Sequence, residues 1–257
     1  MVATARHLRF LGASTLLFTG SGAITVAWSA SMSGMGMVMP GGWTMSMMWM
    51  RMPGQTWLGA TAAFLGMWVV MMAAMMLPSL VPVLLRYRLA IEAAAAHRLG
   101  RLTAMMGAGY FGVWTALGLA VFPLGIALAD LEMVHPALAR AVPVAAGLTV
   151  MAAGALQFTA CKAYHLACCR AVPLRAEVPL DVAGAWRHGV RLGLHCSYSS
   201  AGLTALLLAT GLMELGVMAA VTMAVTMERL APAGDRVARI TGAVIIAVGV
   251  RLILRAA

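Results

Sequence analysis

Nine methionines lie between residues 32 and 52, directly after the first long apolar run of the chain. They are Met32, Met35, Met37, Met39, Met45, Met47, Met48, Met50 and Met52. A thioether sulfur is a soft ligand with no proton to lose, so it binds Cu(I) in preference to Zn(II) or Mg(II) at any pH. Glycines between the first methionines leave the backbone free to wrap around a small ion. The pattern therefore predicts a Cu(I) site, with an amphipathic segment lying on the membrane as the alternative.

A second group of methionines follows in the next apolar run. Met67, Met71 and Met75 recur every four residues, which places their sulfurs on one face of a helix. Met72 and Met76 form a second row beside them. This sulfur stripe extends the soft-metal interpretation into the membrane. Methionine also fills irregular gaps between packed helices, so helix packing explains the stripe equally well.

All four cysteines lie in one region together with two of the six histidines. These residues are Cys161, His165, Cys168 and Cys169, followed by His195 and Cys196. The first four have the spacing i, i+4, i+7 and i+8, and share one face if the helix continues through them. Thiolate and imidazole groups on one face bind a soft or borderline metal, and a hairpin to the last two residues would complete a shared site. The alternatives are inert buried cysteines and, least favoured, a redox pair, because adjacent Cys168 and Cys169 point about 100° apart on a helix.

The composition indicates what kind of fold must hold these residues. Of 257 residues, 62% are hydrophobic and 10% are charged, whereas about 25% are charged in a soluble domain. The formal net charge is +10, but the arginines lie between apolar runs and are topology signals rather than nucleic-acid contacts. Four cysteines are too few for a secreted disulfide scaffold. No phosphate loop, nucleophile elbow or carboxylate pair indicates an enzyme.

Apolar stretches of about 20 residues predict helices that span a bilayer. Seven are expected, at Phe10–Ala30, Trp57–Leu80, Leu102–Leu128, Val142–Leu166, Leu192–Ala209, Glu214–Leu230 and Val237–Leu254. The first is longer than the apolar core of a signal peptide, so we expect it to be retained. The predicted fold is an all-α, polytopic membrane helix bundle that forms one domain over residues 1–257.

The positive charges predict the orientation of these spans. With the N-terminus in the cytoplasm, 14 of the 18 Lys and Arg residues lie on the cytoplasmic side, as the positive-inside rule requires. The expected location is the bacterial inner membrane, with the Met-rich segment 31–56 outside and the Cys/His residues inside, where the cytosol keeps thiols reduced. Glu214 and Glu228 flank the sixth span and are interpreted as interfacial residues, with a functional intramembrane acid as the alternative.

Several blocks of sequence, in order, resemble a bacterial family described as predicted metal-binding integral membrane proteins, some of whose members carry the label copper chaperone. The likeness covers about residues 55–232. Its blocks are Met67–Trp68 with Met71–Pro78, Gly109–Tyr110 with Trp114, Gly154 with Gln157, Thr159, Lys162, Cys169 and Arg170, then Gly193–Cys196 and Gly211–Pro232. The resemblance implies a multi-span inner-membrane protein with a metal role. Similar proteins often have further cysteines after Cys196, where this chain has Ser199 and Ser200, and fewer thiolates lower the affinity for a soft metal.

These features together predict a copper-handling membrane protein without catalytic activity. We expect the external Met-rich segment to capture Cu(I) and to transfer it to the cluster of Cys161, His165, Cys168, Cys169 and Cys196. The expected partners are the lipid bilayer and a copper-accepting protein or membrane complex, with no nucleic acid. The alternative function is a non-catalytic membrane subunit or assembly factor that uses its Met-rich faces to pack against other proteins.

Overall fold

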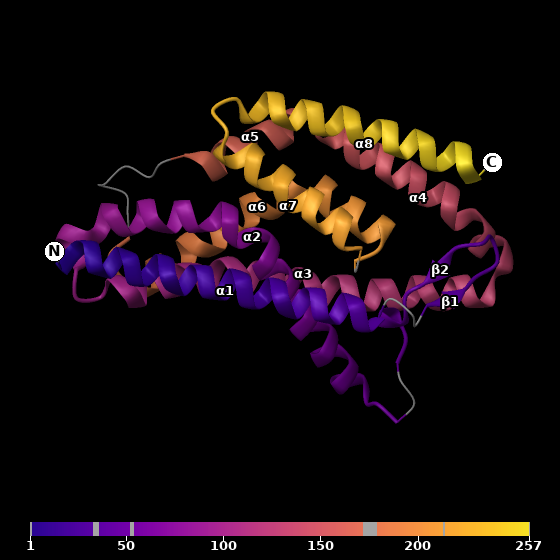
Figure 1. Cartoon of the computed structure of the whole chain (residues 1–257), viewed down its shortest axis with the longest axis horizontal. Helices are drawn as coiled ribbons and strands as arrows, with labels where there is room; N and C mark the ends of the chain where they lie inside the picture. Colours follow the sequence, from indigo (N-terminus) through magenta and orange to yellow (C-terminus); the bar gives the residue numbers. More distant parts are fainter. Residues whose placement is uncertain (1, 33–35, 52–53, 172–178, 213, 257) are drawn as a thin grey trace.

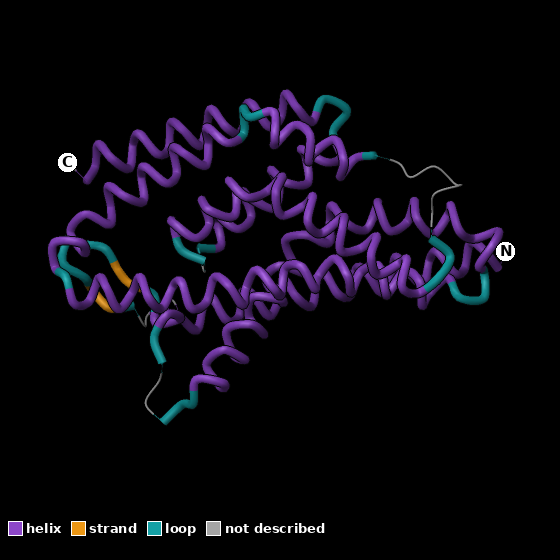
Figure 2. Tube along the Cα trace, turned by 180° about the vertical axis from the view of Figure 1, so that it is seen from behind, coloured by secondary structure: helices purple, strands orange, loops and turns teal. Residues whose placement is uncertain are grey.

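The predicted all-α fold is confirmed by a computed structural model of the chain, which describes residues 2–32, 36–51, 54–171, 179–212 and 214–256. Within these residues, eight α-helices form most of the structure (Figures 1 and 2). They are α1 (Val2–Met32), α2 (Trp57–Ala95), α3 (Leu99–Val134), α4 (Pro136–Leu156), α5 (Ala160–Arg170), α6 (Val182–Thr210), α7 (Leu215–Leu230) and α8 (Gly234–Ala256). A hairpin of two strands, β1 (Met37–Val38) and β2 (Thr44–Met45), and a short 3-10 helix, η1 (Met47–Trp49), lie between α1 and α2.

Six of the described helices are long and apolar enough to cross a membrane, where the sequence predicts seven. They are α1 from Ala5 onward, α2, α3, α4, α6 and α8. The difference is α7, which occupies the predicted sixth span but has only 16 residues. At 1.5 Å per residue it is about 24 Å long, shorter than the roughly 30 Å hydrocarbon core of a bilayer.

The predicted fourth span, Val142–Leu166, is divided between α4 and α5. The helix ends at Leu156, and α5 begins anew because the Thr159 hydroxyl accepts a hydrogen bond from the backbone N–H of Lys162 at 3.2 Å. The helix that carries Cys161, Cys168 and Cys169 is therefore placed by its own contacts with α6 and α7.

The helices pack in layers, with α1, α2 and α3 on one side, the α4–α8 pair on the other, and α6 and α7 between them (Figure 1). Two close approaches require glycine. A Cβ on Gly154 would lie 2.8 Å from the carbonyl oxygen of Gly242, which draws α4 and α8 together. A Cβ on Gly193 would lie 2.9 Å from the carbonyl oxygen of Tyr110, so α6 lies directly against α3.

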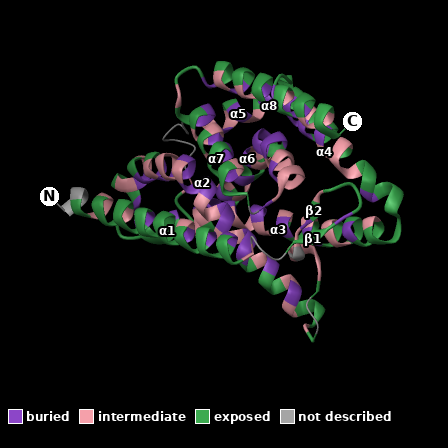
Figure 3. Ribbon diagram, turned by 45° about the vertical axis from the view of Figure 1, so that its right-hand side comes forward, coloured by how far each residue is buried: buried purple, intermediate pink, exposed green. Residues whose placement is uncertain are grey.

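Helix α2 supplies the centre of the core. Trp68, Met71, Met72, Met75 and Met76 are each at most 2% exposed, so both rows of the predicted sulfur stripe are enclosed by other helices (Figure 3). The first turns of α2 extend away from the bundle, whereas its later part runs alongside α1 (Figure 1). Two prolines inside the helix each remove a backbone donor and favour a bend.

Candidate metal centre

The Met-rich segment forms a hairpin that is docked on the ends of α3 and α4. Met39 and Met45 are buried and pack with Ala129 of α3 and Ala139 of α4. The indole N–H of Trp43 donates a hydrogen bond to the carbonyl oxygen of Ala139 at 2.8 Å. The hairpin is thus attached to the bundle partly through two of its own methionines, Met39 and Met45.

The remaining methionines of this segment have different environments. Met37 is exposed, and Met32, Met48 and Met50 are half-buried. Met35, Met52 and the side chain of Met47 lie outside the described residues. The segment therefore has thioether sulfurs that are not fully buried as well as those of the buried Met39 and Met45.

A buried sulfur centre, which we define as Met76, Cys169 and Cys196, brings together residues of α2, α5 and α6 that belong to one buried core cluster. The thiol of Cys196 donates a hydrogen bond to the thioether sulfur of Met76 at 3.9 Å. On its other side, Cys196 Sγ is hydrogen-bonded to Tyr110 Oη at 2.8 Å. Met76, Tyr110 and Cys196 are each at most 1% exposed, so this contact is closed to solvent.

Cys169 approaches the same region from α5. Its sulfur lies 3.9 Å from the hydroxyl of Ser199, which in turn donates to the backbone oxygen of Cys196 at 2.9 Å. The guanidinium of Arg229 donates to Cys169 Sγ at 3.5 Å and to the hydroxyl of Ser79 at 3.3 Å. Arg229 is also electrostatically coupled to Cys196 and Tyr110. One buried cation therefore contacts the thiol of Cys169 and acts electrostatically on that of Cys196.

Among the described residues, positive charges outnumber negative ones around this centre, where Lys162, Arg170 and Arg229 lie near the single carboxylate of Glu228. Lys162 Nζ and Glu228 Oε2 form an ion pair at 2.6 Å, and Lys162 also donates to the backbone oxygen of Ser199. The other described salt bridge is that of His7 with Glu92, so Arg229 forms no salt bridge in the described part of the chain, although the carboxylate of Glu228 interacts with it electrostatically. The buried charge of Arg229 favours the ionised form of nearby thiols.

The thiol of Cys169 is nevertheless protonated in the metal-free protein. Burial raises the pKa of Cys169 to about 11, and the charge of Arg229 opposes that rise only in part. A metal ion must therefore displace a proton from this residue when it binds.

The six predicted Cys and His ligands do not form one cluster. Cys169 and Cys196 face inward, whereas His165 and His195 meet on the outer side of the α5–α6 contact with their Nδ1 atoms 2.9 Å apart. Cys161 is exposed and Cys168 is half-buried. Among the described residues, no three His, Cys, Asp or Glu side chains gather in a way that could hold a metal ion. The reason is that α5 buries the face that carries Lys162, Leu166 and Cys169. Of the four residues predicted to share a face of this helix, only Cys169 is buried.

Three charged residues near the sulfur centre were not predicted as site residues from the sequence. Arg229 and Lys162 were assigned to cytoplasmic positive charge, and Glu228 to the interface, but all three are buried. The signal was present in α7, where Val221, Val225, Glu228 and Arg229 have the i, i+4, i+7, i+8 spacing of a buried face.

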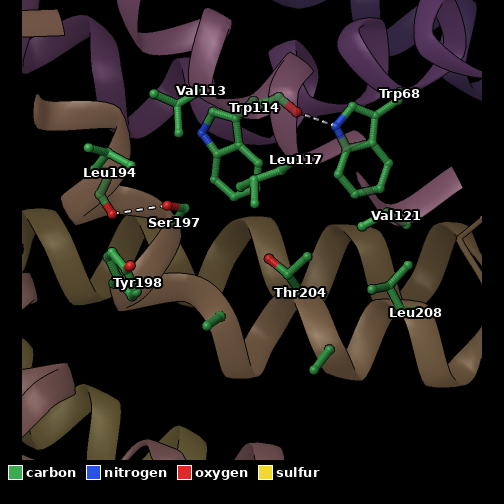
Figure 4. A pocket seen from close by; sticks show the side chains of 12 residues that line it. Trp68, Val113, Trp114, Leu117, Val121, Leu194, Ser197, Tyr198, Thr204 and Leu208 are labelled. Carbon is green, nitrogen blue, oxygen red and sulfur yellow. Dashed lines mark hydrogen bonds between the residues drawn. The ribbon is translucent and has the colours of Figure 1, made fainter. Parts of the chain in front are cut away.

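A groove lies between α3 and α6. Its walls are mainly apolar and include Trp68, Trp114 and Leu208, with hydroxyls from Tyr198 and Thr204 (Figure 4). The indole N–H of Trp68 donates to the carbonyl oxygen of Trp114 at 2.8 Å. No Cys, His or carboxylate lines the groove, so its chemistry suits an apolar occupant and not a metal ion.

Comparison with known proteins gives one match. A sequence model of the PpoB2 family, described as copper chaperone, matches residues 65–252. No curated protein matches the chain, and no solved structure does. The matched region begins after the Met-rich segment and contains all three members of the sulfur centre together with Arg229. Because it covers most of the sequence, the chain belongs to the copper chaperone family.

Proposed function

We propose that this protein is a membrane-bound Cu(I) carrier that holds the ion at the sulfur centre of Met76, Cys169 and Cys196. The observation that carries the proposal is the position of Arg229, a buried cation that donates a hydrogen bond to the thiol of Cys169, interacts electrostatically with Cys196 and forms no salt bridge among the described residues. Thiolate and thioether sulfurs are the ligands that select Cu(I). Membership of the copper chaperone family supports the same metal.

Charge balance explains why Arg229 suits this role. Binding of Cu(I) by two thiols releases two protons and leaves a complex with one negative charge. The guanidinium of Arg229 neutralises that charge in a place where water cannot. Tyr110, through its hydrogen bond to Cys196, would orient that sulfur and adjust its basicity, as outer partners of metal ligands commonly do.

The Met-rich segment is proposed as the capture site that supplies this centre. Met48 and Trp49 pack against the main core, and the rings of Trp49 and Phe64 lie 5.5 Å apart. From there, Met67, Met71 and Met75 lead along α2 to Met76. The nine-residue step from Met67 to Met76 covers about 13 Å at 1.5 Å per residue. Thioethers bind the ion first and thiolates bind it more tightly, so the gradient favours movement toward the sulfur centre.

The remaining features of the proposal concern the cellular setting. We place the protein in the bacterial inner membrane with its N-terminus in the cytoplasm, on the strength of its distribution of Lys and Arg. It would catalyse no reaction and would deliver Cu(I) to a copper-accepting protein or membrane complex. The sequence alternative, in which methionine faces pack against partner proteins, is disfavoured because Met71, Met72, Met75 and Met76 are enclosed by the chain's own helices.

The test is anaerobic Cu(I) binding by the full-length protein in detergent, measured by competition with bicinchoninate. The Cys169→Ser/Cys196→Ser variant should lose one tightly held ion per chain. The matched control is Cys161→Ser, which removes an exposed thiol on the same helix as Cys169 and should bind as wild type does. If the double variant retains the full copper content and affinity, the sulfur centre is not the site.

A further inference from the structure

Two imidazoles meet beside the sulfur centre on the same pair of helices. His165 of α5 and His195 of α6 are hydrogen-bonded through their Nδ1 atoms at 2.9 Å. His195 directly precedes Cys196, and His165 lies one helical turn before Cys169. Each helix thus carries one imidazole on the outer side of their contact and one thiol on the inner side.

Aromatic contacts fix the orientation of both rings. The ring of Tyr198 stacks on His165 with centroids 4.8 Å apart and planes 20° apart. Tyr164 meets the two imidazoles edge-on, at 5.1 Å from His165 and 6.2 Å from His195. The two imidazoles are therefore held between aromatic neighbours from both helices, with their Nδ1 atoms directed at one another, an arrangement that favours a two-ligand site.

We propose that His165 and His195 form a second, outer Cu(I) site that exchanges the ion with the sulfur centre. This inference rests on the proposed function. Two metal–nitrogen bonds of about 2 Å each would place the nitrogens up to about 4 Å apart, so the rings need to separate by about 1 Å from their metal-free distance. The metal would replace the proton that the two nitrogens share.

Ligand chemistry suits this pair to exchange rather than storage. Neutral imidazole binds copper but is a harder ligand than thiolate, so it holds Cu(I) less tightly. Both histidines are half-buried, whereas Cys169 and Cys196 are at most 3% exposed. An ion on the outer pair is therefore less enclosed by the protein than an ion on the inner thiols. The half-buried Cys168 lies three residues from His165 on α5, where it can assist the passage.

The experiment uses the full-length protein in detergent, loaded anaerobically with Cu(I), and the variant His165→Gln/His195→Gln. His188→Gln is the matched control, because His188 is also half-buried on α6 and its ring stacks on Tyr87. The first readout is the copper content that remains after gel filtration without chelator, and the second is the rate at which bound copper passes to an excess of bicinchoninate. X-ray absorption of the loaded protein reports copper–nitrogen scattering.

We expect the double histidine variant to hold one ion fewer than wild type, to release its remaining copper at least tenfold more slowly, and to lose the copper–nitrogen signal. The inference is overturned if content, release rate and signal all match wild type while Cys169→Ser/Cys196→Ser still loses its ion; the pair is then a packing contact only. The reverse result, with losses in the histidine variant alone, supports the outer site and contradicts the sulfur centre. Absence of any bound copper in wild type overturns both.

Discussion

The Met-rich hairpin and the sulfur centre contain the same soft donor but differ in what surrounds it. In the hairpin, Met39 and Met45 pack with Ala129, Ala139 and two tryptophans in an apolar cluster. In the sulfur centre, Met76 contacts a thiol that lies beside a buried guanidinium. The difference is that the sulfur centre offers thiols that can ionise beside a buried counter-charge, whereas the hairpin offers thioethers in an apolar cluster. The family match includes the second region and leaves out the first.

Replacing Arg229 tests this difference most severely. Arg229→Met should lower the Cu(I) affinity of the sulfur centre by about a hundredfold, the upper range for loss of a group that supports metal ligands. The physical reason is that the copper–dithiolate complex keeps an uncompensated negative charge. Arg229→Lys retains the charge and should recover most of the affinity. Equal affinities in wild type and Arg229→Met, measured by chelator competition, would mean that the centre needs no counter-charge.

The pH dependence of binding separates the two regions next. The pKa of Cys169 is raised to about 11 by burial, so its thiol is protonated below that pH and its proton must leave when copper binds. Copper affinity of the sulfur centre should therefore fall about tenfold for each unit by which the pH is lowered, per proton displaced. Thioethers carry no such proton, so copper on the hairpin should be indifferent to pH. Titrations at several pH values between 6 and 9 would distinguish the two behaviours.

The fold was largely predictable from the sequence because helix length and apolar runs are local properties. The spans at α1, α2, α3 and α6 follow from uncharged stretches, whereas the one at α8 was predicted in spite of Arg239 and Arg251 within it. The break between α4 and α5 was not predicted, because it depends on one capping threonine within an apolar run. Helix α7 was predicted as a span, but it has only 16 residues and is partly buried against other helices.

The candidate site was predictable only in part, for a related reason. Cysteine and histidine residues pointed to the two helices that carry the proposed centre, and both of its thiols were in the predicted set, but Met76 was not among the predicted metal ligands. The division of the predicted ligands into an inner pair of thiols and an outer pair of imidazoles depends on which face of α5 meets α6 and α7. The role of Arg229 was hidden because a buried arginine and a cytoplasmic arginine look alike in a topology count.

A third thiol at Ser199 would sharpen the comparison by strengthening one region alone. The Ser199 hydroxyl lies 3.9 Å from Cys169 Sγ and is 3% exposed. Ser199→Cys should raise the Cu(I) affinity of the centre by about tenfold, since soft thiolates select Cu(I). Ser200→Cys is the control, because the Ser200 hydroxyl bonds back to the Cys196 carbonyl oxygen and is equally buried. The same gain in both variants would show that proximity to Cys169 is irrelevant.

Two neighbouring methionines of α2 provide a finer test within the core. Met76 and Met72 are both 1% exposed, and substitution of either by Leu preserves side-chain volume, with a stability cost below about 1.5 kcal/mol. Met76→Leu should weaken Cu(I) binding a few-fold to about tenfold because the thioether near Cys196 is lost. Met72→Leu should leave the affinity unchanged. Thermal unfolding of both variants checks that folding is preserved, and equal affinities would remove Met76 from the site.

The smallest effect on affinity is expected in the hairpin, where a substitution should change the rate of copper loading but not the final copper affinity. Met37→Leu/Met50→Leu removes one exposed and one half-buried thioether and leaves the packed Met39 and Met45 in place. If this segment captures copper for the sulfur centre, loading from a Cu(I)–chelator complex should slow a few-fold while the final affinity of the centre stays at the wild-type value. Met39→Leu/Met45→Leu is the opposite change, because it alters sulfurs that serve the docking of the hairpin. Unchanged loading rates in the first variant, followed by stopped-flow absorbance of the chelator, would restrict the copper function to the buried region and leave the hairpin a structural role.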